Sequence, residues 1–321
     1  METVIGTNIQ HAAKLLMADE VVAIPTETVY GLAGNACSET ALLKIFNTKQ
    51  RPLHNPLILH VASLEQAMPF CLHIPETVKA LTEKFWPGPL TLLLPKKPGS
   101  LPNLLNNNLP EIAVRVPDHP LTLALLNQLP FPLAAPSANP FGYISPTTPE
   151  HVLKQLGGKI PYILDGGPCK RGIESTIVRV TEEGITVLRP GAIPAEKIAE
   201  FTDEVHQHTP QPREKIVAPG MLDQHYAPRT PLTLLDTIPP DWVSSSTPNR
   251  GFLLFNSPLE GVPASKQIIL SASGDLREAA ENLYAALHAL DTMGLDEIVA
   301  EKMPPQGLGV AINDRLQRAA H

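Results

Sequence analysis

Hydrophobic and polar positions follow two different periods along the first two thirds of the chain. Apolar residues recur every three or four positions, the spacing of amphipathic helices, over residues 9–19, 38–49, 75–86, 119–129 and 194–205. Continuous or alternating apolar runs, which are typical of buried strands, occupy residues 21–25, 56–62, 90–95, 112–117, 131–139, 162–167, 175–181 and 184–191. This order predicts an α/β domain with a large twisted mixed sheet.

The pattern changes in the last third of the chain. Residues 206–231 have no periodicity and several prolines, which predicts a linker, and a linker of this length is usually functional or disordered. Strand-like runs then alternate with a long amphipathic helix over residues 275–293. We therefore expect a domain over residues 1–205, a linker over 206–231, and a small C-terminal Rossmann-like α/β domain over 232–321.

Composition narrows the class of protein. Hydrophobic residues make up 43% of the 321 residues, and no apolar run reaches the roughly 18 residues that span a bilayer. No signal peptide is recognisable, and Cys37, Cys71 and Cys169 form no CxxC pair, so we expect a reducing cytoplasm and neither disulfides nor a zinc site. The net charge of −7 argues against a general polyanion binder but allows a local basic cleft.

Familiar catalytic motifs are missing from the sequence. It contains no GxxxxGK[ST], HExxH or GxSxG, so a P-loop, a zincin and a serine hydrolase have no support. The run "GLGVAI" (307–312) begins like a dinucleotide-binding loop but lacks the third glycine. The chemistry must therefore come from another kind of site.

Polar side chains gather at the ends of the predicted strands. They are Thr26, Thr28, Tyr30, Lys49, Gln50, Arg51, His60, Arg115, Ser137, Asn139, Ser145, Thr147, Ser175, Thr176 and Arg189. Most also have an ordinary structural explanation: Lys49 and Arg51 fit a helix C-terminus, His60 fits a satisfied core histidine, and the Ser and Asn residues fit turns beside proline. Arg115 is harder to explain in this way, because a guanidinium between two strand valines needs a buried anionic partner.

The combination says more than any one residue. Four basic groups (Lys49, Arg51, Arg115 and Arg189) accompany many hydroxyls and amides, without clustered carboxylates. Such a set suits a polyanion or a carboxylate. ATP phosphates, the carboxylate of an amino acid and the backbone of RNA all remain open on this reasoning.

Seven motifs follow one another in the order and spacing of the YrdC-like family, which the chain resembles over residues 8–195. They are "PTETVYGL", "KQRPLHNPLILHV", "WPGPLTLLL", "VRVPDHP", "AAPSANPFGYISPT", "DGG…GIESTIV" and "LRPGAI". The tail, from "APGMLDQHYAPRTPL" to "GLGVAINDRLQRAA", resembles the longer two-domain threonylcarbamoyl-AMP synthases of this family. The resemblance implies a twisted sheet around a large concave, positively lined cleft.

The resemblance also implies an activity. Such enzymes make L-threonylcarbamoyladenylate from L-threonine, bicarbonate (or CO2) and ATP, with Mg2+ on the ATP phosphates, and release pyrophosphate. The product passes to a tRNA threonylcarbamoyl transferase, which modifies the adenosine next to the anticodon. The alternatives are an RNA-binding module that uses the same basic cleft, and a carbamoyl-transfer enzyme of hydrogenase maturation, whose zinc fingers the three cysteines here exclude.

Site residues carry over from the matching motifs. L-Threonine is expected at Thr28, His60, Arg115, Ala135 and Ser175, and ATP at Lys49, Arg51, Asn55, Glu111, Ser137, Asn139, Ser145, Arg189 and Tyr226. Lys49 and Arg51 are the expected catalytic residues, which would stabilise the triphosphate, and no protein metal ligand is expected. The linker departs from many relatives at Leu222, Asp223 and Gln224.

Overall fold

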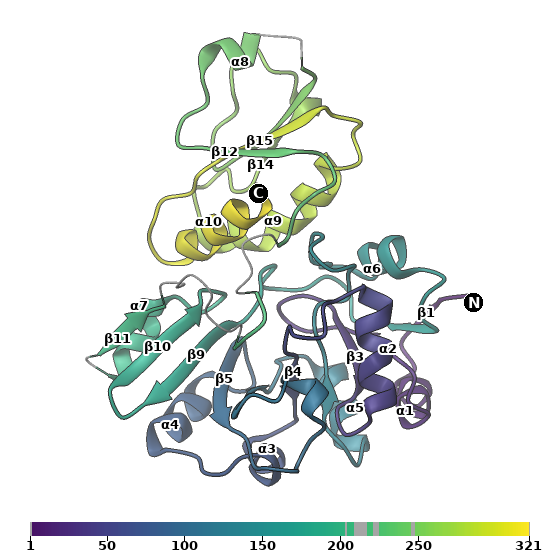
Figure 1. The fold of residues 1–321 in the computed structure, drawn as a ribbon. Helices are drawn as coiled ribbons and strands as arrows, with labels where there is room; N and C mark the ends of the chain where they lie inside the picture. The colour runs from purple at the N-terminus through teal and green to yellow at the C-terminus, as the bar shows by residue number, and fades with distance from the viewer. Residues whose placement is uncertain (1, 203, 209–216, 221–224, 245–247, 321) are drawn as a thin grey trace.

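The computed structural model describes the chain except for residues 1, 203, 209–216, 221–224, 245–247 and 321 (Figure 1). Its first sheet contains β1 (Val4–Gly6), β2 (Val22–Ile24), β3 (Gly31–Asn35), β4 (Ile58–His60), β5 (Leu90–Pro95), β6 (Glu111–Arg115), β7 (Leu133–Ala134), β8 (Tyr162–Leu164), β9 (Thr176–Thr181), β10 (Gly184–Arg189) and β11 (Val205–Gln207). The strand order is β1-β8-β2-β3-β7-β4-β6-β5-β9-β10-β11. Parallel and antiparallel pairs alternate irregularly along it, for example β4 with β6 and β5 with β6, so the predicted mixed sheet is confirmed.

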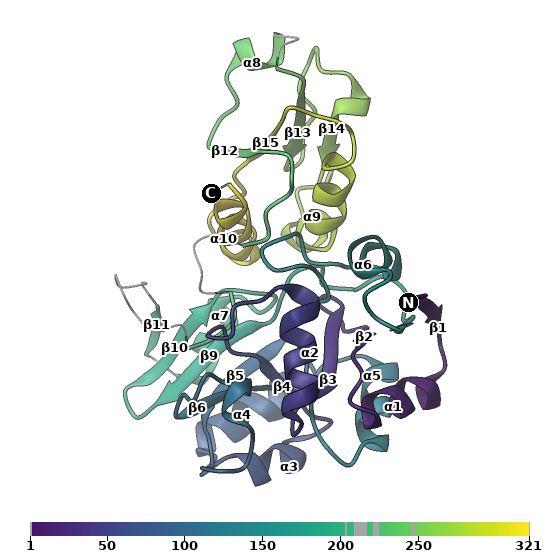
Figure 2. The same ribbon diagram turned by 45° about the vertical axis from the view of Figure 1, so that its right-hand side comes forward.

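Helices cover this sheet at several places. They are α1 (Ile9–Met17), α2 (Glu39–Lys49), α3 (Leu64–Ala67), α4 (Glu76–Phe85), α5 (Pro120–Gln128), α6 (Pro149–Leu156) and α7 (Ala195–Ile198), with 3-10 turns η1 (Met68–Phe70), η2 (Asn103–Leu105) and η3 (Ala199–Phe201). Helices α1 and α5 pack on one face of the sheet, whereas α2 packs on the other (Figure 2). Asn8 and Ser38 cap α1 and α2 through their side-chain oxygens, so the predicted starts of both helices are set by local capping.

Several elements differ from the prediction. The helix expected over 194–205 stops at η3, because Thr202 is extended and Val205 pairs with Ile185 in strand β11. The strand expected over 131–139 is ordered as a strand only at β7. Strand β3 was not expected, since its sequence GLAGN lacks the β-branched and aromatic residues that mark strands.

The C-terminal part has a sheet of its own. It contains β12 (Leu232–Leu235), β13 (Arg250–Leu254), β14 (Gln267–Ile269) and β15 (Glu297–Glu301), with helices α8 (Pro240–Ser244), α9 (Leu276–Leu290) and α10 (Leu308–Ala319) and the turn η4 (Ala264–Lys266). The order is β12-β15-β13-β14, and all three pairings are parallel. The small parallel sheet is therefore confirmed. The run at 307–312, which resembles a dinucleotide-binding loop only weakly, leads into helix α10 instead.

Helices α9 and α10 lie between the small sheet and the large one in both views (Figures 1 and 2). Their buried side chains share one apolar cluster with Val29, Ile144, Ile173 and Tyr226, which belong to loops at the edge of the large sheet. Burial of apolar surface stabilises such a contact, so this junction is packed like a core. Among the described residues, no helix is long and apolar enough to cross a membrane.

Candidate active site

The stretch PTETVYGL connects two neighbouring antiparallel strands. Strand β2 ends at Ile24, and β3 begins at Gly31, its partner in register. Between them, the Thr26 hydroxyl donates to the Val29 carbonyl at 2.7 Å and accepts from the amides of Thr28 and Val29. This local hydrogen bonding folds a tight loop, which presents Thr26, Glu27 and Thr28 to the end of the sheet.

Arg115 meets this loop from strand β6. Its Nη2 lies 2.7 Å from Glu27 Oε1 and donates to the Thr28 hydroxyl at 2.9 Å. Both charged side chains are almost fully buried, at 5% and 3% exposure. The anionic partner that Arg115 requires is therefore found inside the chain, although no contact in the described residues uses its Nη1.

His60 stands beside Arg115, because β4 and β6 pair in register at these two residues. The ring Nδ1 lies 3.1 Å from the Ile58 carbonyl. Burial, followed by the charge of Arg115, lowers the pKa of His60 to about 3. The imidazole is therefore neutral at physiological pH, which suits a hydrogen-bonding role more than a charged one.

Gly31 lies where the PTETVYGL loop meets strand β3. Its φ is not positive, and it opens β3 with a bridge to Ser137. A Cβ at this position would lie 3.2 Å from the Ala135 Cβ. Gly31 therefore serves close packing and not a turn. Without a side chain, it allows two backbones to approach closely beside the site.

Lys49 ends α2 and is buried under the loop that follows β7. Its Nζ donates to the carbonyls of Ser137 and Asn139, both at 2.5 Å. Burial, followed by the nearby Arg51, lowers the pKa of Lys49 well below its ordinary value. Lys49 thus fixes the loop that contains Ser137 and Asn139, and it influences the site through this loop.

Arg51 follows the left-handed C-cap residue Gln50 and turns toward the next strand. Its Nη2 donates to Asn55 Oδ1 at 2.6 Å and to the Pro56 carbonyl at 2.8 Å. Burial is the main factor that lowers the pKa of Arg51 to about 9, and Arg189 adds to this effect. The two guanidiniums therefore create an excess of positive charge that an anion would relieve.

Arg189 ends β10 opposite Arg51. Its Nη2 donates to the carbonyl of Ser175 at 2.8 Å and to its hydroxyl at 3.1 Å, and its Nη1 donates to the Pro219 carbonyl at 3.2 Å. The Ser175 hydroxyl also lies 2.7 Å from that of Thr91. Strand ends β5, β9 and β10 thus bring these polar groups together.

These residues enclose one narrow cavity of about 50 Å³. Its walls include His60, Arg115, Ala135, Ser137, Ser175, Arg51, Arg189 and Tyr226. Pro219, Gly220, His225 and Tyr226 of the predicted linker also line it, so described linker residues close the cavity. Leu222, Asp223 and Gln224 lie outside the described residues.

Three buried polar atoms at this cavity have no hydrogen-bond partner in the described part of the chain. They are Arg189 Nε, His225 Nδ1 and the Tyr226 hydroxyl. A buried polar group without a partner is unfavourable by ~1–3 kcal/mol. Such atoms around a common cavity are the arrangement expected of a ligand site.

Ser145 reaches the site through a residue that the sequence analysis missed. Its hydroxyl donates to Glu174 Oε1 at 2.7 Å, and Glu174 also lines the cavity. Burial alone would raise the pKa of Glu174, but the guanidiniums of Arg315 and Arg189 outweigh it and lower this pKa to about 2. The site therefore contains one permanent carboxylate, which the sequence analysis did not single out.

Other predicted residues lie further from the cavity. Thr28, Lys49 and Asn55 touch residues of its wall without lining it. Asn139 lies one step further away, since its carbonyl accepts a bond from Lys49. Glu111 lies at the opposite end of β6 from Arg115 and binds Arg179 through both carboxylate oxygens. Tyr30 turns away and donates to the Gly167 carbonyl.

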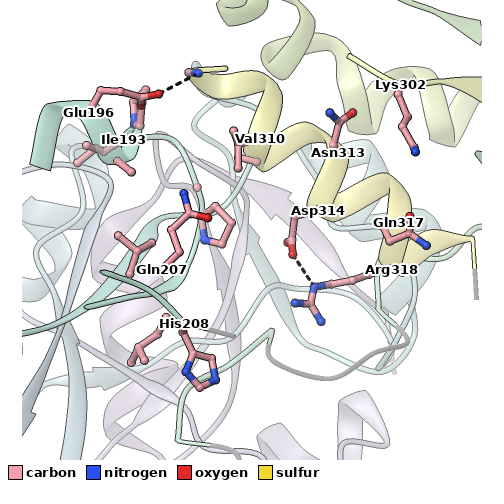
Figure 3. A pocket seen from close by; sticks show the side chains of 18 of the residues that line it. Ile193, Glu196, Gln207, His208, Lys302, Val310, Asn313, Asp314, Gln317 and Arg318 are labelled. Atoms are coloured by element: carbon pink, nitrogen blue, oxygen red, sulfur yellow. Dashed lines mark hydrogen bonds and ion pairs between the residues drawn. The ribbon is translucent and has the colours of Figure 1, made fainter. Parts of the chain in front are cut away.

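A larger cavity, of about 540 Å³, lies at the junction of the two parts. Figure 3 shows Asp314 and Arg318 on α10 facing Gln207 and His208 across it. None of the predicted site residues lines this cavity. Its size alone does not make it the site, because the buried cations and the unpartnered polar atoms surround the smaller one.

The fold and the site define a class of protein. Residues 14–191 match the model of the Sua5–YciO–YrdC family, described as "Telomere recombination", and residues 193–321 match "Threonylcarbamoyl-AMP synthase, C-terminal domain". Escherichia coli YciO has the same fold over 59% of this chain, with a TM-score of 0.50 at 22% identity. The large sheet is therefore that of the YrdC-like proteins.

Full-length relatives identify the family. The threonylcarbamoyl-AMP synthase of Bacillus subtilis is 40% identical over 97% of this chain and 92% of its own length. The crystal structure of Pyrococcus abyssi Sua5 complexed with L-threonine has a TM-score of 0.88 at 37% identity, and covers 99% of this chain and 97% of that one. The chain belongs to the two-domain threonylcarbamoyl-AMP synthase family.

Proposed function

We propose that this chain is an L-threonylcarbamoyladenylate synthase. It combines L-threonine, bicarbonate or CO2, and ATP into threonylcarbamoyl-AMP and releases pyrophosphate. The near-full-length likeness to the Bacillus subtilis synthase and to the threonine-bound Pyrococcus abyssi protein supports this activity. The product serves a transferase that modifies the adenosine next to the anticodon of tRNA. The cytoplasmic location of the protein stays a prediction.

The observation that carries the proposal is the narrow cavity with its buried cations and unpartnered atoms. Arg51, Arg115 and Arg189 all line it. Guanidiniums bind carboxylates and phosphates through paired donors, and two such anionic groups, on threonine and on ATP, have to meet here. A general RNA cleft would offer several aromatic rings for stacking, whereas Tyr226 is the single Tyr, Phe or Trp among the described residues that line this cavity.

We assign the threonine end to the side of the cavity next to β4, β6 and β7. Arg115 Nη1 binds the carboxylate, neutral His60 and the Thr28 and Ser175 hydroxyls orient the polar groups, and the backbone at Ala135 contacts the amino-acid skeleton. Support comes from the register pairing of His60 with Arg115 and from the bond between Arg115 and Thr28. Glu27 then keeps Arg115 in place when the site is empty.

We assign the nucleotide end to Arg51, Arg189 and Tyr226, with Lys49, Asn55, Ser137, Asn139 and Ser145 holding the surrounding loops. Arg51 remains the proposed catalytic residue at the phosphates. Lys49, predicted to be catalytic as well, is proposed to position the loop that it holds, and Glu111 remains a proposed nucleotide contact. A cavity of about 50 Å³ is far smaller than the ~300–1,000 Å³ of ordinary ligand pockets. The described lining residues Pro219, Gly220, His225 and Tyr226 therefore have to move before ATP enters, and they act as a lid.

The lid has a chemical purpose. The neutral threonine amine attacks CO2 to form a carbamate, and a carbamate oxygen attacks the α-phosphorus of ATP as pyrophosphate leaves. A carbamate decomposes in water, so exclusion of water protects it. The transfer itself needs positioning and charge neutralisation more than a covalent nucleophile.

Magnesium fits this site as a companion of ATP. No group of three His, Cys, Asp or Glu side chains in the described residues could hold a metal ion. The ion would therefore arrive on the phosphates, where it neutralises negative charge. The protein supplies arginines to the remaining phosphate oxygens.

The test is pyrophosphate release from ATP, Mg2+, bicarbonate and L-threonine. Release that requires both threonine and bicarbonate, with threonylcarbamoyl-AMP as the adenylate product, is the expected result. Release without threonine would indicate a simple ATP pyrophosphohydrolase. ATP binding without release, together with RNA affinity that falls steeply with salt, would replace the synthase with the RNA-binding module.

A further inference from the structure

A buried ionic cluster joins the C-terminal helices to the site. Glu174, next to the proposed threonine contact Ser175, accepts Arg315 Nε at 2.8 Å and the Tyr284 hydroxyl at 2.8 and 3.0 Å. Tyr284 lies on α9 and Arg315 on α10. Both carboxylate oxygens of a residue in the cavity wall are therefore held from the C-terminal part.

Arg315 has further contacts that fix its position. It is fully buried, Nη2 donates to the Pro190 carbonyl at 2.9 Å, and Nη1 lies 2.5 Å from Asp314 Oδ2. Its guanidinium also lies 5.0 Å from the centre of the Tyr226 ring. One side chain thus contacts the cavity carboxylate, the residue after Arg189, and the lid tyrosine.

Glu174 and Arg189 line the same cavity, and the unpartnered Nε of Arg189 is buried there. A buried carboxylate next to a buried guanidinium would normally pair with it. Instead Arg315, Tyr284 and the Ser145 hydroxyl occupy the oxygens of Glu174. Arg189 bonds to neutral groups, Ser175 and Pro219. The cavity thereby retains an arginine with a free donor.

We infer that Arg315 and Tyr284 are positioning residues for the nucleotide: they hold Glu174 away from Arg189, so that Arg189 stays available for the phosphates of ATP. This inference rests on the proposed function of the site. It gives the C-terminal part a role in nucleotide affinity besides the placing of the lid. Asp314 orients Arg315 by accepting from its Nη1. Asp314 also accepts from Arg318 beside the larger cavity (Figure 3).

Substitution of Arg315 by methionine tests the inference. Without its partner, Glu174 should pair with Arg189, and the KM for ATP should rise about tenfold or more, while the KM for threonine changes less than threefold. Tyr284→Phe removes one donor and keeps the ring, so it should raise the KM for ATP by a few-fold, even if Arg315→Met folds poorly. Arg250→Met is the matched control, since Arg250 pairs with Glu297 far from the cavity.

The double variant Arg315→Met, Glu174→Gln separates positioning from stability. Glutamine has no charge to pair with Arg189, so the KM for ATP should return to within about threefold of wild type, while the melting temperature stays low. Proportional rises in both KM values, or a double variant without recovery, would overturn the inference. ATP binding by calorimetry gives the same comparison if the wild-type protein releases no pyrophosphate, so that failure of the proposed function is recognised separately.

Discussion

Arg115 Nη2 lies 2.7 Å from Glu27 Oε1, and both side chains are buried. The two residues come from strand β6 and from the loop after β2, next to Thr28 and His60. A buried ion pair costs much desolvation and is a weak argument for stability by itself. Its place beside the cavity points instead to a guanidinium that is held ready for a second carboxylate.

Arg115→Met is therefore expected to weaken L-threonine binding about 100-fold and ATP binding less than threefold. It should also destabilise the fold by ~3–5 kcal/mol, because Glu27 is left buried without its partner. Calorimetric titration with each ligand and urea unfolding measure these effects. In the double variant Arg115→Met, Glu27→Gln, stability should recover while threonine binding should not; equal loss of both ligands in that stable double variant would contradict the assignment.

Lys49→Met is expected to lower pyrophosphate release about 100-fold. The Nζ of Lys49 bonds to the carbonyls of Ser137 and Asn139, so its loss frees the loop that we assign to the nucleotide end of the cavity. Steady-state kinetics with saturating threonine measure the effect. Lys44→Met on the same helix is the control, since Lys44 makes only a half-exposed pair with Glu20; a similar loss in both variants would point to the helix and not to the site.

Gly31→Ala is expected to destabilise the protein by ~1–3 kcal/mol and to weaken threonine binding. A Cβ at this position would lie 3.2 Å from the Cβ of Ala135, on the neighbouring segment. Thermal unfolding and threonine titration test this. Addition of Ala135→Gly should restore binding by removing the other half of the clash, and failure to do so would mean that Gly31 acts through its backbone.

His288 is expected to make stability depend on pH. Burial, followed by the neighbouring His151, lowers its pKa to about 3, whereas an unfolded histidine titrates near 6.5. Below pH 6.5 the unfolded chain binds a proton that the folded chain does not, so stability falls with pH through the window from 6.5 down to 3. Between pH 6.5 and 5 this amounts to about 2 kcal/mol.

His288→Gln should remove that part of the pH dependence. The free energy of unfolding in urea at pH 7 and pH 5 measures the difference, with substitution of the exposed His73 by glutamine as the control. An unchanged slope for His288→Gln would show that His288 contributes no proton linkage. His60, which has the same low pKa, contributes to the remaining slope.

Most helices and buried strands, and the polar groups that follow those strands, could be predicted from the sequence. Caps such as Ser38 and apolar periods act between near neighbours, so they can be read without the fold. The position of Arg115 between two strand valines also predicted a buried anionic partner. Strands β1, β3 and β11 escaped prediction, because pairing with other strands, and not their own residues, stabilises them.

Only the tertiary structure shows which buried charged side chains pair with each other. Glu27 lies 88 positions from Arg115, and Glu174 bonds to Tyr284 and Arg315 over separations of 110 and 141 residues. One local sign of the last contact existed: Arg315 falls on the apolar face of α10, in line with Ala311 and Ala319. A position on an apolar face says that a charge will be buried, but only the packing of α9 and α10 against the large sheet says which carboxylate neutralises it.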